Sequence, residues 1–277
     1  MQYFFRFGAV AAAMLWVQVS ASDHSVKSWN TVTRAGMVYE RNDTKPFTGT
    51  VRSFYPGGKL SEERPVKNGV TEGVVTTWFE NGQKASQTHY HNGLKEGKCI
   101  KWHRNGIKKY EADFVKGREE GEVKYWYQNG THRKVLHFHN GVRQGKLEMW
   151  YDSGEKRALM HFKNGKYDGK RMTWYKDGKP SSEGHYVEGR KEGHFVDYFK
   201  SGKKSLEATY KNGKLHGVRT AWFKNGQKKH ESSFKNGTPD GYDIIWFING
   251  QKQHEAVIKD GNTVSVKVWH KNGARVE

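Results

Sequence analysis

The chain has almost no cysteine. Cys99 is the single one among 277 residues, so no disulfide can form within the chain. If the protein enters an oxidising compartment, it must still be held together by packing and hydrogen bonds. Counted in steps of 24 residues, Cys99 falls in line with Val51, Val75, Val123 and Leu147. We therefore interpret it as a small core hydrophobe.

Aliphatic residues are also scarce. Hydrophobic residues make up 34% of the chain, with few Leu and Ile, which would usually indicate disorder. The chain nevertheless contains 10 Trp, 14 Tyr and 14 Phe. Their large side chains supply the buried area that aliphatic residues supply elsewhere, so we expect a folded protein. No stretch has apolar residues at helical spacing long enough to compete with strands.

Long apolar runs are missing beyond residue 21, so we expect no later transmembrane helix. The run Phe7–Val19 follows a single charge, Arg6, and leads into the small residues Val-Ser-Ala. This pattern predicts a signal peptide over residues 1–21, cleaved between Ala21 and Ser22, and export to the periplasm or outside the cell. The alternative is an uncleaved membrane anchor, for which the run is short.

Repetition is what the chain has in abundance, with a period of 24 residues from Gly49 to the C-terminus. A fixed period of this length indicates a repeat array, and the columns of equivalent residues define its unit. The unit-opening glycines are Gly49, Gly73, Gly97, Gly121, Gly145, Gly169, Gly193, Gly217 and Gly241. Five residues after them stand Phe54, Trp78, Trp102, Trp126, Trp150, Trp174, Tyr198, Trp222 and Trp246.

Each unit contains two turn signals. The first is Asn105-Gly106 or its equivalents, and the second is Asn92-Gly93 or its equivalents. Such pairs tolerate the positive φ angles of a two-residue type I′ hairpin. The stretches between turns are rich in Val, Thr, Tyr, Phe and Trp, which favours strands. We predict an all-β fold, an elongated single-layer antiparallel meander of about ten hairpin repeats over 49–277, with residues 22–48 as a lead-in or cap.

A two-residue first turn would set the register and the two faces of the sheet. Residues equidistant from the turn would pair, so Trp102 would face Lys109. One face would collect packed residues such as Val123, Tyr127, Leu136 and Phe138. Each unit glycine would lie opposite a large ring, as in Gly73 with Tyr90 and Gly121 with Phe138, and would leave room for that ring.

The other face would carry the Trp column beside basic residues. A cation over an indole contributes about 0.5–1 kcal/mol when exposed. A row of exposed aromatic residues often marks a binding surface, although the same Trp side chains could simply pack on long Lys and Arg stems. The candidate binding residues are Trp78, Trp102, Lys109, Trp126, Arg133, Trp150, Arg157, Trp174, Trp222, Lys229 and Trp246.

The repeat unit resembles a known family. Residues 217–237, GVRTAWFKNGQKKHESSFKNG, are similar to the variant MORN repeat found in bacterial proteins called YwqK-like antitoxins. The resemblance covers residues 36–277, including the lead-in that ends in Lys45-Pro-Phe-Thr-Gly49, and implies a curved ribbon of hairpins. The units lack the Gly-Tyr-Gly-like step of the commoner MORN repeat, so phosphoinositide binding is not carried over, and no functional residue is transferred.

Two columns of polar residues could indicate a metal site or a catalytic site, but their spacing argues against both. His89, His137, His161 and His185 would lie roughly 9–10 Å apart, too far to share a metal ion. Glutamates such as Glu63, Glu111, Glu183, Glu207, Glu231 and Glu255 occur once per unit, which favours cross-strand ion pairs over paired catalytic carboxylates. No nucleophile or phosphate-binding motif is present. We expect no enzyme, no cofactor and no metal site.

The net charge of +19 favours anionic partners. Export makes nucleic acid the least expected of them. Our main hypothesis is a non-enzymatic exported scaffold that binds a protein or an envelope surface. The alternatives are an antitoxin or immunity protein that neutralises a cognate toxin, which the resemblance implies, and an envelope protein that binds anionic membrane or polysaccharide. A carbohydrate-active enzyme comes last.

Overall fold

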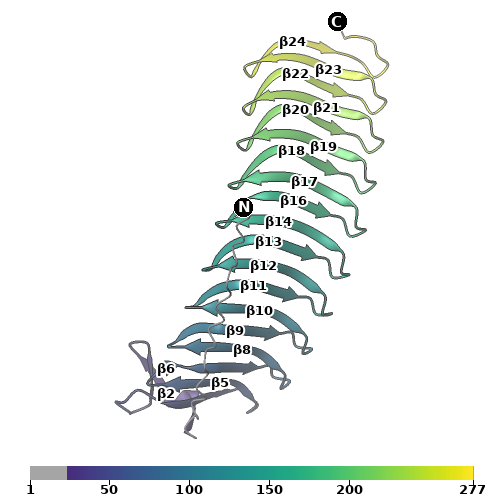
Figure 1. Ribbon diagram of the computed structural model, residues 1–277. Helices are drawn as coiled ribbons and strands as arrows, with labels where there is room; N and C mark the ends of the chain where they lie inside the picture. Colours follow the sequence, from purple (N-terminus) through teal and green to yellow (C-terminus); the bar gives the residue numbers. More distant parts are fainter. Residues whose placement is uncertain (1–23, 277) are drawn as a thin grey trace, which may run out of the picture.

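The structure, a computed structural model that describes residues 24–276, is one long ladder of strands (Figure 1). From β4 to β24 neighbouring strands pair antiparallel in chain order, with β6 and β7 both pairing with β5 and with β15 and β16 both pairing with β14. β1 is added in parallel beside β4. Within the described residues no second layer covers the array. The prediction of an all-β, single-layer meander of hairpin repeats is confirmed.

Each repeat is one outgoing strand, one return strand and two turns. The outgoing strands are β4 (Gly49–Phe54), β6 (Val70–Thr71) with β7 (Gly73–Trp78), β9 (Leu94–Trp102), β11 (Arg118–Trp126), β13 (Val142–Trp150), β15 (Lys166–Tyr167) with β16 (Gly169–Trp174), β18 (Arg190–Tyr198), β20 (Lys214–Trp222), β22 (Thr238–Trp246) and β24 (Asn262–Val268). The return strands are β5 (Leu60–Lys67), β8 (Lys84–His91), β10 (Lys108–Val115), β12 (His132–His139), β14 (Lys156–Lys163), β17 (Pro180–Val187), β19 (Lys204–Lys211), β21 (Lys228–Lys235) and β23 (Lys252–Lys259).

The lead-in lies against the first unit. It consists of β1 (Ser25–Lys27), the short 3-10 helix η1 (Ser28–Asn30) and the hairpin of β2 (Thr31–Arg34) with β3 (Met37–Glu40). Val38 and Phe47 form a small core with Val51 and Val66. Because β1 pairs with β4, this segment covers the N-terminal edge of the sheet, which would otherwise expose unpaired backbone groups.

The two turns have different geometries, and the prediction for the first turn is wrong. At the second turn both Asn92 and Gly93 have positive φ, as a type I′ hairpin requires. At the first turn Gly106 has positive φ but Asn105 does not, Gly106 N–H donates to His103 O, and Ile107 follows as the pairing residue. This is a three-residue loop, a type I turn followed by a glycine bulge.

The longer loop changes the register beside the turn only. Trp102 pairs with Lys108, and a bulge at Lys109 then restores the predicted pairing for the rest of the strand. The predicted partners Gly73–Tyr90 and Gly121–Phe138 are therefore confirmed.

The reason predicted for the unit-opening glycines is wrong. A Cβ added to Gly121, Gly193 or Gly217 would meet nothing within 4 Å, so no ring needs the space. These glycines instead have φ of 75°, 74° and 87°. They are required because few L-residues adopt this left-handed backbone conformation.

Candidate functional site

The sheet has two faces of different chemistry. We call the face that carries Tyr110, Phe114, Tyr125, Phe138 and Phe162 the Tyr–Phe face. These rings pack with Cys99, Val123, Leu136 and Leu147 into the main hydrophobic cluster, as the sequence predicts for Val123, Leu136 and Phe138. Because side chains alternate along a strand, Trp126, three residues after Val123, lies on the opposite face, which we call the Trp face.

On the Trp face four of the indoles are covered by a lysine from the preceding unit, and Trp150 contacts the ring of His132 instead. Lys108 Nζ lies 5.9 Å from the Trp126 ring centroid and 2.7 Å from Glu111 Oε2. The same Trp–Lys–Glu arrangement recurs as Trp222–Lys204–Glu207, Trp246–Lys228–Glu231 and Trp269–Lys252–Glu255. The columnar Trp side chains are half-buried, so they contribute to packing between units.

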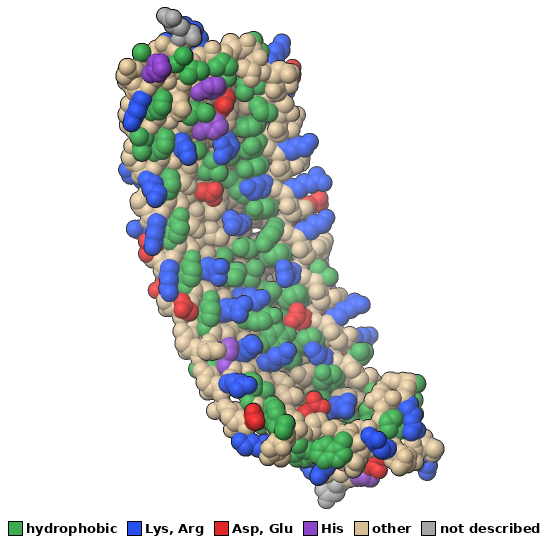
Figure 2. Space-filling view, turned by 180° about the vertical axis from the view of Figure 1, so that it is seen from behind, with side chains coloured by type: hydrophobic (Ala, Val, Ile, Leu, Met, Phe, Trp, Pro, Cys, Tyr) green, Lys and Arg blue, Asp and Glu red, His purple; other side chains and the backbone are tan. Residues whose placement is uncertain are grey.

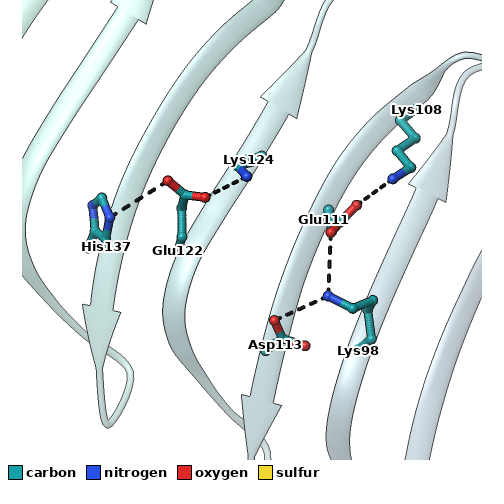
Figure 3. Close-up of polar contacts among 7 residues, drawn as sticks. All are labelled: Lys98, Lys108, Glu111, Asp113, Glu122, Lys124 and His137. Atoms are coloured by element: carbon teal, nitrogen blue, oxygen red, sulfur yellow. Dashed lines mark hydrogen bonds and ion pairs between the residues drawn. The ribbon is translucent and has the colours of Figure 1, made fainter. Parts of the chain in front are cut away.

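The charges of the Trp face are largely paired with one another. Figure 3 shows Lys98 between Glu111 and Asp113, at 3.4 and 3.3 Å, and Glu122 between Lys124 and His137. The hydrogen bond from Lys108 holds the pKa of the Glu111 carboxyl below its ordinary value. Cross-strand or local pairing of the glutamate column is thus observed for five of its six members, while Glu183 accepts a hydrogen bond from Tyr198 Oη.

The basic residues predicted beside the Trp column lie elsewhere. The three-residue loop gives Trp102 and Trp126 the partners Lys108 and His132, not Lys109 and Arg133. Two other predicted partners contact a different column of rings, since Arg157 lies 5.7 Å from the Tyr151 ring and Lys229 lies 5.9 Å from the Phe223 ring. The predicted Trp–basic pairs are therefore wrong, and the binding role of these residues stays a prediction.

Sequence reasoning missed a second set of cations, on the Tyr–Phe face. In Figure 2 hydrophobic side chains run the length of this face with Lys and Arg among them. The cations lie 4.0 to 5.7 Å from ring centroids in the pairs Lys95–Phe114, Lys101–Tyr110, Lys134–Tyr125, Arg143–Phe162 and Lys191–Phe195. In the sequence, these Lys and Arg residues alternate with the recurring Tyr and Phe residues, and this pattern could have predicted the second set of cations.

These cations are not neutralised by neighbours. In the part of the chain that the structure describes, none of the five forms an ion pair within 4 Å. Burial, followed by the nearby charges of Arg133 and Arg143, lowers the pKa of Lys134. The Tyr–Phe face therefore combines largely buried rings with positive charge that no ion pair among the described residues compensates, an arrangement suited to an anionic partner.

Two members of the histidine column form hydrogen bonds to the backbone. His137 Nδ1 lies 3.2 Å from Lys146 O, and His161 Nδ1 lies 3.0 Å from Lys170 O. Among residues 24–276 no group of three or more His, Cys, Asp and Glu side chains is arranged to hold a metal ion.

The predicted signal peptide and its cleavage site at Ala21 and Ser22 lie outside the described residues. Within the described range, no helix is long and apolar enough to cross a bilayer.

No curated protein matches the chain. Among solved structures, the chain is similar to the crystal structure of TcdB2-TccC3, with 10% identity over 82% of this chain and 18% of that one, at a TM-score of 0.16. It is also similar to the crystal structure of TcdB2-TccC3-Cdc42, with 9% identity over 86% of this chain and 17% of that one, at a TM-score of 0.14. The chain thus spans less than a fifth of either structure's chain.

The family comparison concerns the repeat unit itself. Six segments match the family described as MORN repeat variant, at residues 47–68, 71–92, 119–140, 167–188, 191–212 and 215–236. Repeats of this kind generally form non-enzymatic scaffolds for protein or membrane interaction. Six segments of the ladder of hairpins are therefore similar to the MORN repeat variant.

Proposed function

We propose that the protein is an exported, non-enzymatic repeat scaffold that binds an anionic protein or envelope component along its Tyr–Phe face. One observation carries the choice of face. The lysines over the Trp column are paired with glutamates, whereas Lys101, Lys134 and Arg143 lie over rings without a carboxylate partner. An anionic ligand gains more from unpaired cations, because it does not have to displace an internal ion pair.

The repeat geometry supports an extended partner. Equivalent residues recur once per hairpin, roughly every 9–10 Å along the ladder, so a long ligand can make the same contact many times. Several weak contacts on one partner add up to strong binding through their high effective concentration. The net charge of +19 assists capture of such a ligand.

A pull-down from an envelope extract tests the proposal with two variants of equal charge. The first, Lys101→Gln with Lys134→Gln and Arg143→Gln, removes three cations from the Tyr–Phe face. The control, Lys108→Gln with Lys204→Gln and Lys228→Gln, removes three from the Trp face. We expect the first variant to lose its partner and the control to keep it, with circular dichroism confirming that both are folded.

Three results would contradict the choice of face. Equal weakening of both variants would mean non-specific charge attraction, and loss in the control alone would place binding on the Trp face. Loss of the partner on Trp126→Ala with Trp150→Ala, in a folded protein, would also favour the Trp face. We expect that pair of changes to lower the melting temperature and leave binding intact.

The alternatives from the sequence give distinct results in the same experiment. An antitoxin or immunity protein would capture one protein whose binding survives high salt, because a packed interface is screened less than exposed charges. A membrane-binding protein would bind vesicles of anionic lipid without any protein partner. The antitoxin alternative rests on the family resemblance alone.

A further inference from the structure

One segment of the array departs from the repeat. In the column of Val51, Val75, Cys99, Val123 and Leu147, the next two members are Arg171 and Phe195. In the column of Thr88, Ala112, Leu136 and Met160, the next member is Gly184. No other unit has a tyrosine in the column of Tyr167 or an aspartate in the column of Asp197. Unlike residues gathered in one place are what a specific site requires and a plain scaffold does not.

These departures surround one cavity on the Tyr–Phe face. Its volume is about 460 Å³, and Tyr167, Arg171, Tyr186, Lys191, Phe195 and Asp197 are among its lining residues. The Phe195 ring lies over Gly184, where any side chain would overlap it. The loss of a side chain at Gly184 and the gain of a ring at Phe195 thus belong together, and they shape the floor of the cavity.

The walls are a continuous series of rings. Successive centroids are 4.7 Å apart from Phe162 to Tyr167, 5.4 Å to Tyr186, 5.4 Å to Phe195 and 5.1 Å to Tyr210. Phe162 and Phe195 are buried, and the ring planes of Tyr186 and Phe195 are 83° apart, so the apolar surface open to a ligand is that of Tyr167 and Tyr186. It suits a ligand with a flat C–H face.

Three charged side chains converge on these rings. Arg171 Nη1 donates to Ser182 Oγ at 3.1 Å, which leaves its other N–H groups available, and Lys191 Nζ lies 4.9 Å from the Phe195 ring and 4.6 Å from the Tyr210 ring. Asp197 lines the same cavity. No ion pair within 4 Å involves Arg171, Lys191 or Asp197 in the described part of the chain.

The donors and acceptors define the ligand. Arg171 and Lys191 require an anionic group, and a carboxylate fits the planar guanidinium. Asp197 accepts hydrogen bonds only, so the ligand must also present hydroxyl or N–H donors. A peptide strand fits poorly, because it binds backbone groups at a sheet edge and these strands lie inside the ladder. An anionic, hydroxyl-bearing ring with flat faces is a sugar acid.

We propose that this cavity binds a uronic acid residue of an acidic polysaccharide, packed against the rings of Tyr167 and Tyr186, with its carboxylate on Arg171 and Lys191 and a hydroxyl on Asp197. This inference rests on the proposed function, because it names the ligand class of the Tyr–Phe face. The neighbouring sugars of the chain would continue along the Tyr–Phe face toward Tyr210.

Isothermal titration of the full chain with oligogalacturonate, at a fixed salt concentration, tests the site. A neutral oligogalactan of equal length is the ligand control. We expect binding of the acidic oligosaccharide alone. We expect Arg171→Gln to weaken it about tenfold or more, since a charge-assisted contact is lost. Asp197→Asn, which is nearly isosteric, should also weaken binding although it makes the face more positive. Lys204→Gln, on the Trp face, should change it little.

The outcome for Asp197→Asn separates recognition from charge. Tighter binding in that variant, or equal weakening by Arg171→Gln and Lys204→Gln, would mean general attraction to a polyanion and would overturn the site. Equal binding of the neutral oligosaccharide would overturn the carboxylate contact. Binding of anionic vesicles but not oligogalacturonate would replace the sugar acid with a lipid headgroup. If no acidic oligosaccharide binds while the envelope partner is still captured, this inference fails and the proposed function stands.

Discussion

Glycine has two different roles at the scale of single residues. Gly121 has φ of 75° and open space around it, so its backbone conformation alone requires glycine. Gly184 has no left-handed φ, but an added Cβ would lie 2.8 Å from Phe195 Cγ and closer still to two other ring atoms. The first glycine is required by conformation and the second by space, although the sequence shows only the letter G at both.

This difference predicts that Ala and Asn substitutions are tolerated in opposite order at the two glycines. At Gly121, Asn should destabilise less than Ala, because Asn tolerates the left-handed region that costs an ordinary residue about 1–2 kcal/mol. At Gly184, Ala should cost about 1–3 kcal/mol through overpacking, and the larger Asn should cost more. Urea unfolding of the four single variants measures both orders. Phe195→Leu should recover part of the loss in Gly184→Ala, and the same order at both sites would refute the distinction.

At the scale of the element, the turns join neighbouring units. Glu120 at the end of one hairpin accepts the N–H of Asn140 in the next type I′ turn at 2.6 Å, and contacts His139 Nδ1 at 2.8 Å. Glu72, Glu96 and Glu192 make the equivalent bond to the turns that follow them. In the next unit Gln144 takes the place of the glutamate and accepts from Asn164 N–H at 2.9 Å. A neutral acceptor therefore serves the same turn.

A pH-dependent contribution from Glu120 follows. The hydrogen bond from Asn140 N–H, and next the one from His139, lower the pKa of the Glu120 carboxyl below its ordinary 4.5. A lowered folded-state pKa means that this contribution is present above pH 4.5 and is lost as pH falls below it. Glu120→Gln should match the parent at pH 7 and lose less stability on acidification. Glu120→Ala should lose about 0.5–1 kcal/mol at pH 7.

Thermal melts of the three proteins between neutral and acidic pH measure these effects. The difference between parent and Glu120→Gln isolates the one carboxyl from the other acidic groups. An identical acid response in parent and Glu120→Gln would show that the turn contact does not contribute.

The turns also show where sequence reasoning reaches its limit. An Asn-Gly pair occupies both turns, but it holds the central positions of the type I′ turn at Asn92 and the last two positions of the three-residue loop at Asn105. The letters do not distinguish these placements. The resulting one-residue error moved the partner of Trp102 from Lys109 to Lys108, and the bulge at Lys109 cancelled it beyond. The pairing of Gly121 with Phe138, far from the loop, was therefore predictable.

At the scale of the whole molecule, the 24-residue period predicted the architecture but did not indicate the candidate site. The columns of glycine and aromatic residues were enough to predict strands, hairpins and a single layer. They also directed attention to the conspicuous Trp column, which proves half-buried beneath Lys108 and its equivalents. The cavity near Gly184 was visible in the sequence only as breaks in the columns at Arg171, Gly184 and Phe195. Its shape required coordinates, because ring positions depend on contacts between units.

The same periodicity makes deletion of a whole unit a sharp test of the molecule. Removing residues 124–147 takes out 24 residues and joins Val123 to Glu148, so the strand keeps its alternation and every new neighbour is an equivalent one. Removing residues 124–146 takes out 23 and joins Val123 to Leu147, which moves each following side chain of that strand to the other face.

We expect the 24-residue deletion to fold cooperatively, with the urea m-value lowered by roughly a tenth because one unit of surface is missing. The protein that lacks 23 residues keeps one residue more than the protein that lacks 24, yet it should unfold at lower urea concentration and less cooperatively. Its strand would place Glu148 on the Tyr–Phe face, against the hydrophobic cluster that Leu147 occupies in the parent. Equal stability of the two deletion variants would mean that the side chains of neighbouring units need not lie on matching faces of the sheet. That result would contradict the prediction.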